Sequence, residues 1–124
     1  MKTRAWVAIA FGGLLGAGLR WATVEALPVG SLHWGLLAAN TIGCAVFGFL
    51  FGARNLAELR SELHLAATTG FCGSLTTLSG FSVITADALR DGRQGDAVAF
   101  VILSLLAGLA ATWSGRRLAR AIPQ

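Results

Sequence analysis

Apolar residues fill four long stretches of this chain, and the charged residues gather between them. A transmembrane helix needs about 20 mostly apolar residues to cross roughly 30 Å of hydrocarbon. Four stretches meet this requirement, over about residues 6–26, 34–53, 63–86 and 97–115. The pattern therefore predicts an all-α membrane protein with four transmembrane helices in each subunit.

The composition supports a membrane protein rather than a soluble domain. Of the 124 residues, 55% are hydrophobic and 13% are charged, and the mean hydropathy is +0.67. The four stretches use most of the chain, so we expect residues 1–124 to form a single multi-pass unit in a cell membrane. The first stretch is long, rich in glycine and without a convincing cleavage site, so we expect it to be retained rather than removed as a signal peptide.

The positive charges flank the predicted spans, which is typical of membrane orientation. The net charge is +4, but no basic patch is interleaved with aromatic residues, so we expect no nucleic-acid partner. With the N-terminus inside, more basic residues lie inside than outside. The inside set is Lys2, Arg4, Arg54, Arg60, Arg116, Arg117 and Arg120, and the outside set is Arg20, Arg90 and Arg93.

The third stretch contains the segment GFCGSLTTLSGFS, which is unusually polar for a membrane span. Between residues 70 and 82 it carries three glycines and five hydroxyl side chains. Glycine weakens a helix, and serine or threonine can cap helix ends. We therefore predict that the third helix is broken at mid-membrane, near Gly73–Thr77, which would free carbonyls for a cation and N–H groups for an anion. The alternative is a continuous helix whose hydroxyls bond to the carbonyls four residues earlier.

Small and polar positions mark faces of the first two spans. Gly12 and Gly16 stand four residues apart, as do Gly48 and Gly52, so each pair predicts a face for close helix packing. Asn40 is the one strongly polar side chain of the second span. Because an amide at this depth is costly unless it is paired, we expect Asn40 to face another helix or a wet pathway.

The fourth span carries a polar stripe, and the first span ends near an arginine. Phe100, Ser104, Gly108 and Thr112 recur every four residues, so they share one face of the predicted helix. Arg20 lies near the end of the first span, where it either reaches the membrane interface or serves a function.

The spans lack the residues that catalysis or proton coupling requires. None has an acidic residue at its centre, and no set of nucleophile, base and orienting group is visible, so we expect no enzyme. Cys44 and Cys72 both fall inside spans, where they are expected to act as small buried hydrophobes rather than as a disulfide or metal ligands. A small four-span proton-coupled multidrug exporter would need a glutamate within the first span, and none occurs before Glu25.

Three sequence elements together resemble the Fluc (CrcB-type) family of fluoride channels. The segment GFCGSLTTLSGFS is similar to the family signature G-F-C-G-G-L-T-T-F-S-T-F. The segment GGLLGAGLRW resembles the family opening G-G-x-x-G-A-x-x-R-[YW], and AANTIG resembles its N-x-x-G element. The length, the four spans and the order of the elements agree, so the resemblance covers nearly the whole chain.

The resemblance implies a fluoride-specific passive channel that exports cytoplasmic fluoride and relieves its toxicity. It implies an antiparallel dimer in the lipid bilayer, with two fluoride pathways and a structural sodium ion (Na+) at the dimer centre. The backbone carbonyls of Gly73 and Thr76 would hold the sodium ion, and Arg20 would lie in the vestibule. Neutral donors and ring edges would line the ion pathway at Asn40, Phe81, Ser79, Ser82, Phe100, Ser104 and Thr112.

The sequence departs from the family pattern at four positions. Leu78 replaces the first phenylalanine of the signature, Gly80 a threonine, Ser74 a glycine, and Leu36 a threonine of the second span. A leucine lacks the polarised edge of an aromatic ring, and the charge bias disfavours insertion in both orientations. Two assemblies therefore stay open: a homodimer, or a heterodimer in which this chain is a partner subunit that does not conduct without an oppositely oriented homologous chain.

Overall fold

The computed structural model describes residues 3–30, 32–53 and 61–122, and within these ranges the only regular structure is helical. This confirms the predicted all-α class. Lys2, Arg54 and Arg60, which contribute to the predicted charge bias, lie outside the described residues. In chain order, the helices are α1 (Thr3–Ala26), α2 (Trp34–Gly52), α4 (Ser61–Leu65), η1 (Ala66–Cys72), α5 (Gly73–Leu75), α6 (Leu78–Arg90) and α7 (Gln94–Ala121).

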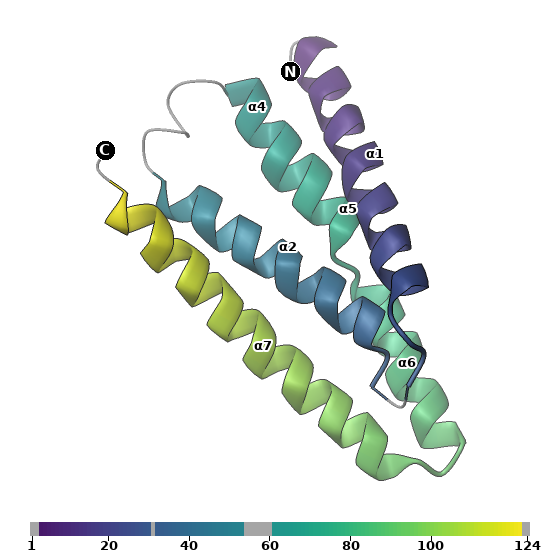
Figure 1. The fold of residues 1–124 in the computed structure, drawn as a ribbon. Coiled ribbons are helices and arrows are strands. Elements are labelled where there is room, and N and C mark those ends of the chain that lie inside the picture. Colours follow the sequence, from purple (N-terminus) through teal and green to yellow (C-terminus); the bar gives the residue numbers. More distant parts are fainter. Residues whose placement is uncertain (1–2, 31, 54–60, 123–124) are drawn as a thin grey trace.

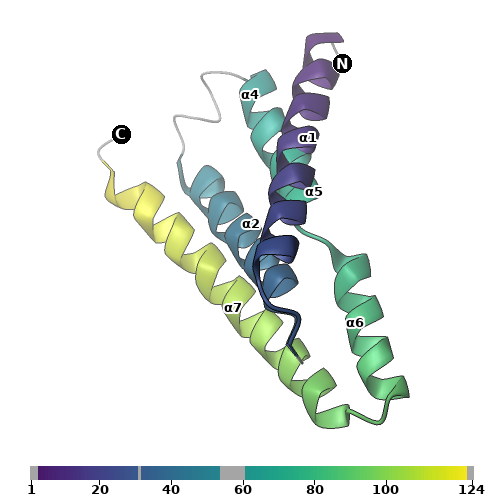
Figure 2. The same ribbon diagram turned by 45° about the vertical axis from the view of Figure 1, so that its right-hand side comes forward.

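The helices form an elongated bundle in which consecutive long segments run in opposite directions (Figures 1 and 2). The start of α1, the start of α4 and the end of α7 lie at one end of the bundle. The end of α1, the start of α2 and the turn between α6 and α7 lie at the other end. Accordingly, the arginines near the end of α7 and those of the α6–α7 turn lie at opposite ends of the molecule.

Three of the helices are long and apolar enough to cross a membrane: α1, α2 and α7. Their surfaces carry large apolar side chains that the chain itself leaves exposed. Leu14 of α1 is 73% exposed and Leu109 of α7 is 70% exposed. Side chains of this kind, spread along whole helices, need lipid or another protein against them. The fold is therefore that of a membrane protein.

Glycines bring α1 against the third apolar segment. A Cβ atom placed on Gly12 would collide with the Ala66 carbonyl of η1, and one on Gly16 with the Phe71 carbonyl. From the other side, a Cβ on Gly70 would collide with the Ile9 carbonyl of α1. The close-packing face predicted at Gly12 and Gly16 is confirmed, and η1 is its partner.

The second glycine face joins α2 to α7, the two helices with the most extensive mutual contact (Figure 1). A Cβ on Gly48 would collide with the Thr112 carbonyl, and one on Gly115 with the Ala45 carbonyl. A Cβ on Gly52 would stand 2.8 Å from the Arg116 carbonyl oxygen. The prediction for Gly48 and Gly52 is therefore confirmed, and the glycines bring the two backbones close together.

The third apolar segment is divided into several helical pieces. It begins as α4 and continues as η1, a π-helix of seven residues that the sequence pattern did not predict. After α5, the chain leaves the helix at Thr76 and re-enters it at Leu78. The pieces before Thr76 pack mainly on α1, whereas α6 packs mainly on α7. The alternative of one continuous helix over residues 63–86 is therefore wrong.

Candidate functional site

Two extended residues separate α5 from α6. Thr76 has φ −85° and ψ 150°, and Thr77 has φ −147° and ψ 121°, so both leave the helical region. The hydroxyl of Thr77 accepts the N–H of Gly80 at 3.1 Å and caps the first turn of α6. The interruption thus lies at the C-terminal end of the predicted range, and the threonine rather than Gly73 supplies the non-helical backbone.

The side chain of Asn40 holds the interruption. Its Oδ1 atom accepts the N–H of Thr77 at 2.8 Å, and its Nδ2 atom donates to the Thr77 carbonyl at 3.4 Å. One amide group of α2 therefore satisfies both backbone polar groups of an extended residue, as a neighbouring strand would. Since a side-chain amide has two N–H donors, Nδ2 keeps one donor beyond this pairing. The expectation that Asn40 meets a partner at depth is met by the backbone of the third segment.

At the interruption, the backbone N–H groups that would bond to the Gly73 and Thr76 carbonyls in a continuous helix bond to other acceptors. In such a helix, the N–H of Thr77 would bond to the Gly73 carbonyl and that of Gly80 to the Thr76 carbonyl. Here the first donates to Asn40 Oδ1 and the second to the Thr77 hydroxyl. The family resemblance predicted that the carbonyls of Gly73 and Thr76 bind a cation. These are the two carbonyls whose helical N–H partners bond to side chains instead.

A hollow of about 280 Å³ opens beside these carbonyls. Its lining consists of Gly43, Cys44, Phe47, Thr68, Cys72, Gly73, Thr76 and Thr112. The hydroxyls of its threonines donate to the carbonyls four residues earlier, at 2.7 to 2.9 Å. Because a hydroxyl has one proton, these groups turn oxygen lone pairs rather than donors toward any occupant. The lining is therefore suited to a cation, and it includes Thr112, which was predicted for the anion pathway.

Two phenylalanines, one from α6 and one from α7, stack on each other. The rings of Phe81 and Phe100 have centroids 5.6 Å apart and planes inclined by 28°. Phe100 is 1% exposed, so its ring belongs to the core between α6 and α7. The structure thus brings together two of the ring positions predicted for the ion pathway.

The predicted hydroxyl donors differ in how they are engaged. The Ser82 hydroxyl donates to the Leu78 carbonyl at 2.9 Å, and the Ser79 hydroxyl lies 3.0 Å from the Thr77 hydroxyl. The Ser104 Oγ atom is buried and has no hydrogen-bond partner among the described residues. Of the predicted serines, Ser104 therefore offers a proton that no protein group uses.

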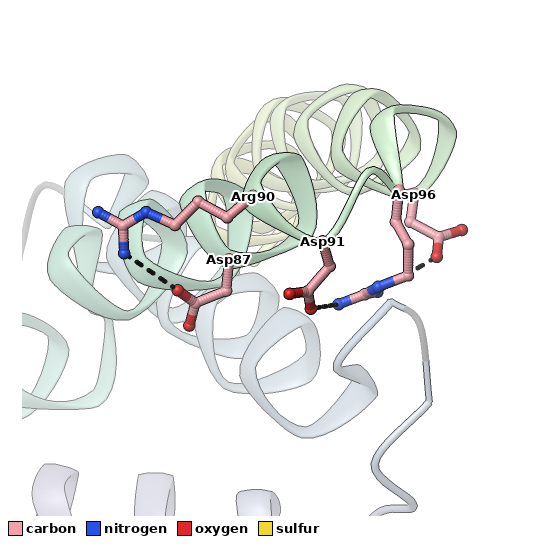
Figure 3. Close-up of polar contacts among 5 residues, drawn as sticks. Asp87, Arg90, Asp91 and Asp96 are labelled. Atoms are coloured by element: carbon pink, nitrogen blue, oxygen red, sulfur yellow. Dashed lines mark hydrogen bonds and ion pairs between the residues drawn. The ribbon is translucent and has the colours of Figure 1, made fainter.

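The charged groups at one end of the bundle form a compact set of ion pairs. In the α6–α7 turn, the Arg93 guanidinium reaches Asp91 and Asp96, each at 3.3 Å, and Arg90 lies 3.6 Å from Asp87 (Figure 3). Hydrogen bonds to Asp91 and then to Asp96 raise the pKa of the Arg93 side chain. Arg20, the predicted vestibule residue, is half-buried and lies six residues before the end of α1 at Ala26.

Two features of the site escaped the sequence analysis. The π-helix over Ala66–Cys72 has the sequence AATTGFC, and nothing in it distinguishes this helix type from an α-helix. His33 was treated as a residue at a span edge, but its ring lies 6.4 Å from that of Phe100. A histidine just before the second span was the available signal, and sequence alone could not connect it to a residue 67 positions away.

The fold and the site define a helical membrane protein with an interrupted helix whose joint is held by a half-buried amide. Residues 7–116 match the family model described as CrcB-like protein, Camphor Resistance (CrcB). The chain belongs to the CrcB family.

Several relatives are named as channels. The chain is 39% identical over 116 residues to a protein of Azotobacter vinelandii named fluoride-specific ion channel FluC, covering 88% of this chain and 91% of the relative. It is 36% identical over 122 residues to a protein of that name from Pseudomonas putida F1, covering 91% and 94%. It is 37% identical over 120 residues to fluoride-specific ion channel FluC 1 of Streptomyces avermitilis, covering 94% and 97%. These names agree with the expectation of an ion channel rather than an enzyme.

Proposed function

We propose that this chain is a subunit of a fluoride-selective channel that lets cytoplasmic fluoride leave the cell passively. The observation that carries the proposal is the joint at Thr77, held by the Asn40 amide. At this joint the Asn40 amide, which is neutral, keeps one N–H donor that its two bonds to Thr77 do not use. The names of relatives that match nearly the whole chain support fluoride as the ion.

Fluoride is small and strongly hydrated, so a channel must replace its water with fixed donors. The spare N–H of Asn40 and the unpartnered hydroxyl of Ser104 are suitable, because both are neutral. The polarised edges of Phe81 and Phe100 add a weak attraction without charge. Neutral groups bind weakly enough for the ion to leave, as conduction requires. The membrane potential supplies about 2.3 kcal/mol per charge for each 100 mV, so export needs no other energy source.

We further propose that the hollow beside Gly73 and Thr76 holds a structural sodium ion. The carbonyls of these two residues would be its ligands, and the lone pairs turned into the hollow fit a cation. Gly73 is exposed, and a Cβ atom on it would meet nothing closer than a carbonyl oxygen 4.0 Å away. An exposed glycine with open space beside it suits a site completed by a second subunit, which supports an antiparallel four-span dimer in the cell membrane.

The test is fluoride efflux from liposomes that contain the purified chain, recorded with a fluoride-selective electrode. We expect efflux above that of empty liposomes once a potassium ionophore removes the opposing voltage, and little chloride efflux in parallel. Efflux from this chain alone supports the homodimer, and efflux only after co-expression with an oppositely oriented homologue supports the heterodimer. No fluoride flux in either preparation would contradict the channel. Glu25→Gln serves as a control, since complete loss of flux in this variant would favour a proton-coupled exporter.

A further inference from the structure

The backbone of His33 is strained, and its side chain makes no helix-capping hydrogen bond that would account for this conformation. Its φ of 43° and ψ of 60° lie in the left-handed region, where it is the only described residue other than glycine with a positive φ. For a residue with a side chain, this conformation costs roughly 1–2 kcal/mol. The His33 carbonyl accepts the N–H groups of Leu36 and Leu37 at the start of α2, but the imidazole makes no capping bond. The ring is therefore available for another role.

The imidazole extends the stack of rings beside the interruption. Its centroid lies 6.4 Å from that of Phe100, with the ring planes inclined by 68°, and Phe100 in turn stacks on Phe81. Three rings from three parts of the chain thus form a row, from the α2 entrance to the core between α6 and α7. The two phenylalanines offer only weakly polarised edges, whereas a neutral imidazole carries an N–H donor.

His33 also lines a hollow of about 360 Å³ that reaches the first turn of α6. Ser79 and Gly80 line the same hollow, and most of the remaining lining is aliphatic. The Thr77 hydroxyl accepts the N–H of Gly80 and lies 3.0 Å from the Ser79 hydroxyl. If Thr77 donates its one proton to Ser79, the proton of Ser79 remains for a ligand. The hollow therefore brings the His33 and Ser79 side chains into one cavity, next to the hydroxyl that caps α6.

We propose that His33 and Ser79 form an anion-binding step of the fluoride pathway, between the α2 end of the bundle and the interruption at Thr77. Resting on the proposed channel function, this assigns His33 as a residue that contacts the ion. The imidazole N–H and the Ser79 hydroxyl replace part of the water around a small, hydrated halide.

The experiment compares three substitutions of His33 in the liposome efflux assay. His33→Phe keeps an aromatic ring beside Phe100 but removes the donor. His33→Gly removes both and relieves the left-handed strain, so it serves even if the phenylalanine variant folds poorly. His33→Asn keeps an N–H donor and tolerates the left-handed conformation. The matched control is His64→Phe, the same change at the other histidine of the chain, which lies in α4.

We expect about a tenfold or larger loss of fluoride efflux in His33→Phe and His33→Gly, because a donor to a charged ligand is lost. His33→Asn should stay within about threefold of the unaltered chain, a difference smaller than a donor's full contribution. Elution volume and thermal midpoint, measured alongside, report whether a loss comes from folding. Unchanged efflux in His33→Gly, or a loss in His33→Asn as large as in His33→Phe, would overturn the inference while the channel stands. Absence of efflux from the unaltered chain would overturn both.

Discussion

The α2–α7 pair and the joint between α5 and α6 show two different ways of building helices into a membrane. In the pair, both helices run without interruption, and Gly48 and Gly115 let the backbones touch. At the joint, the helix stops for Thr76 and Thr77, and the Asn40 side chain takes over the hydrogen bonds of the backbone. The comparison shows that the two arrangements depend on each other, because the closely packed helix α2 also positions the side chain that bonds to the non-helical backbone at Thr77. The continuous helix α2 is what carries the amide to the place where the other helix is open.

The largest effect is expected from a substitution of Asn40, the amide at the joint. Asn40→Asp keeps an oxygen for the Thr77 N–H but sets a carboxylate against the Thr77 carbonyl and the permeating anion. An uncompensated charge at this depth costs several kcal/mol, so we expect fluoride efflux to fall by about a hundredfold or more. Thr41→Ser is the control, because that hydroxyl bonds to the Leu37 carbonyl within the same helix. Full efflux in Asn40→Asp would contradict the role of the amide.

A methyl group in the helix pair should have the next largest effect. In Gly48→Ala, the added Cβ meets the Thr112 carbonyl, which belongs to the backbone and cannot move aside cheaply. Overpacking of this kind costs about 1–3 kcal/mol, and we expect a lower thermal midpoint in detergent. Gly108→Ala provides a matched control, since its Cβ would lie 3.5 Å from the Cys44 sulfur, an ordinary contact. Equal midpoints for the two variants would show that α2 and α7 are not packed through Gly48.

Removing the cap of α6 tests the joint from its other side. Thr77→Val keeps the side-chain shape but leaves the Gly80 N–H without its acceptor. Loss of a helix cap costs about 1 kcal/mol, so a moderate fall in thermal midpoint is expected. Thr85→Val makes the same change within α6, where the hydroxyl only donates to the Phe81 carbonyl, and should be milder. The capping role fails if Thr85→Val proves the more destabilising of the two.

The smallest effect is expected in the α6–α7 turn. Arg93→Gln removes the ion pairs to Asp91 and Asp96, which lie in solvent and are screened by salt (Figure 3). A slight fall in thermal midpoint at low salt should vanish at high salt. Because pairing raises the pKa of Arg93, the ion pairs contribute fully to stability at neutral pH. This contribution is lost only as the pH rises through the raised pKa of Arg93. A large loss that persists in high salt would assign the turn a structural role that exposed ion pairs do not have.

The sequence predicted the parts of this architecture that depend on local composition. Long apolar runs located α1, α2 and α7, and four-residue glycine spacing located both close-packing faces. The interruption was predicted within a few residues, because glycines and hydroxyls accumulate around it. These signals are local, because each depends only on the residues of one segment and not on which segment packs against it.

The parts that escaped prediction are pairings between distant segments. An amide within a span must find a partner, but nothing in the sequence says that Asn40 meets Thr77, 37 residues further on. The row of His33, Phe100 and Phe81 likewise depends on the rotation of three elements about their axes. The π-helix packs on α1, which is distant in the sequence, and its own residues gave no sign of this helix type.

The joint at Thr77 also has a mechanical consequence. The helical pieces before it pack mainly on α1 and α6 packs mainly on α7, so the interrupted segment links two groups of helices, and α2 contacts both groups. Any sliding between these groups must be taken up by the peptide units of Thr76 and Thr77, the only extended residues between α5 and α6. With both hydrogen-bonding groups of Thr77 tied to α2, that compliance is small. A joint of this kind suits the proposed passive channel better than it suits the alternating motions of a pump.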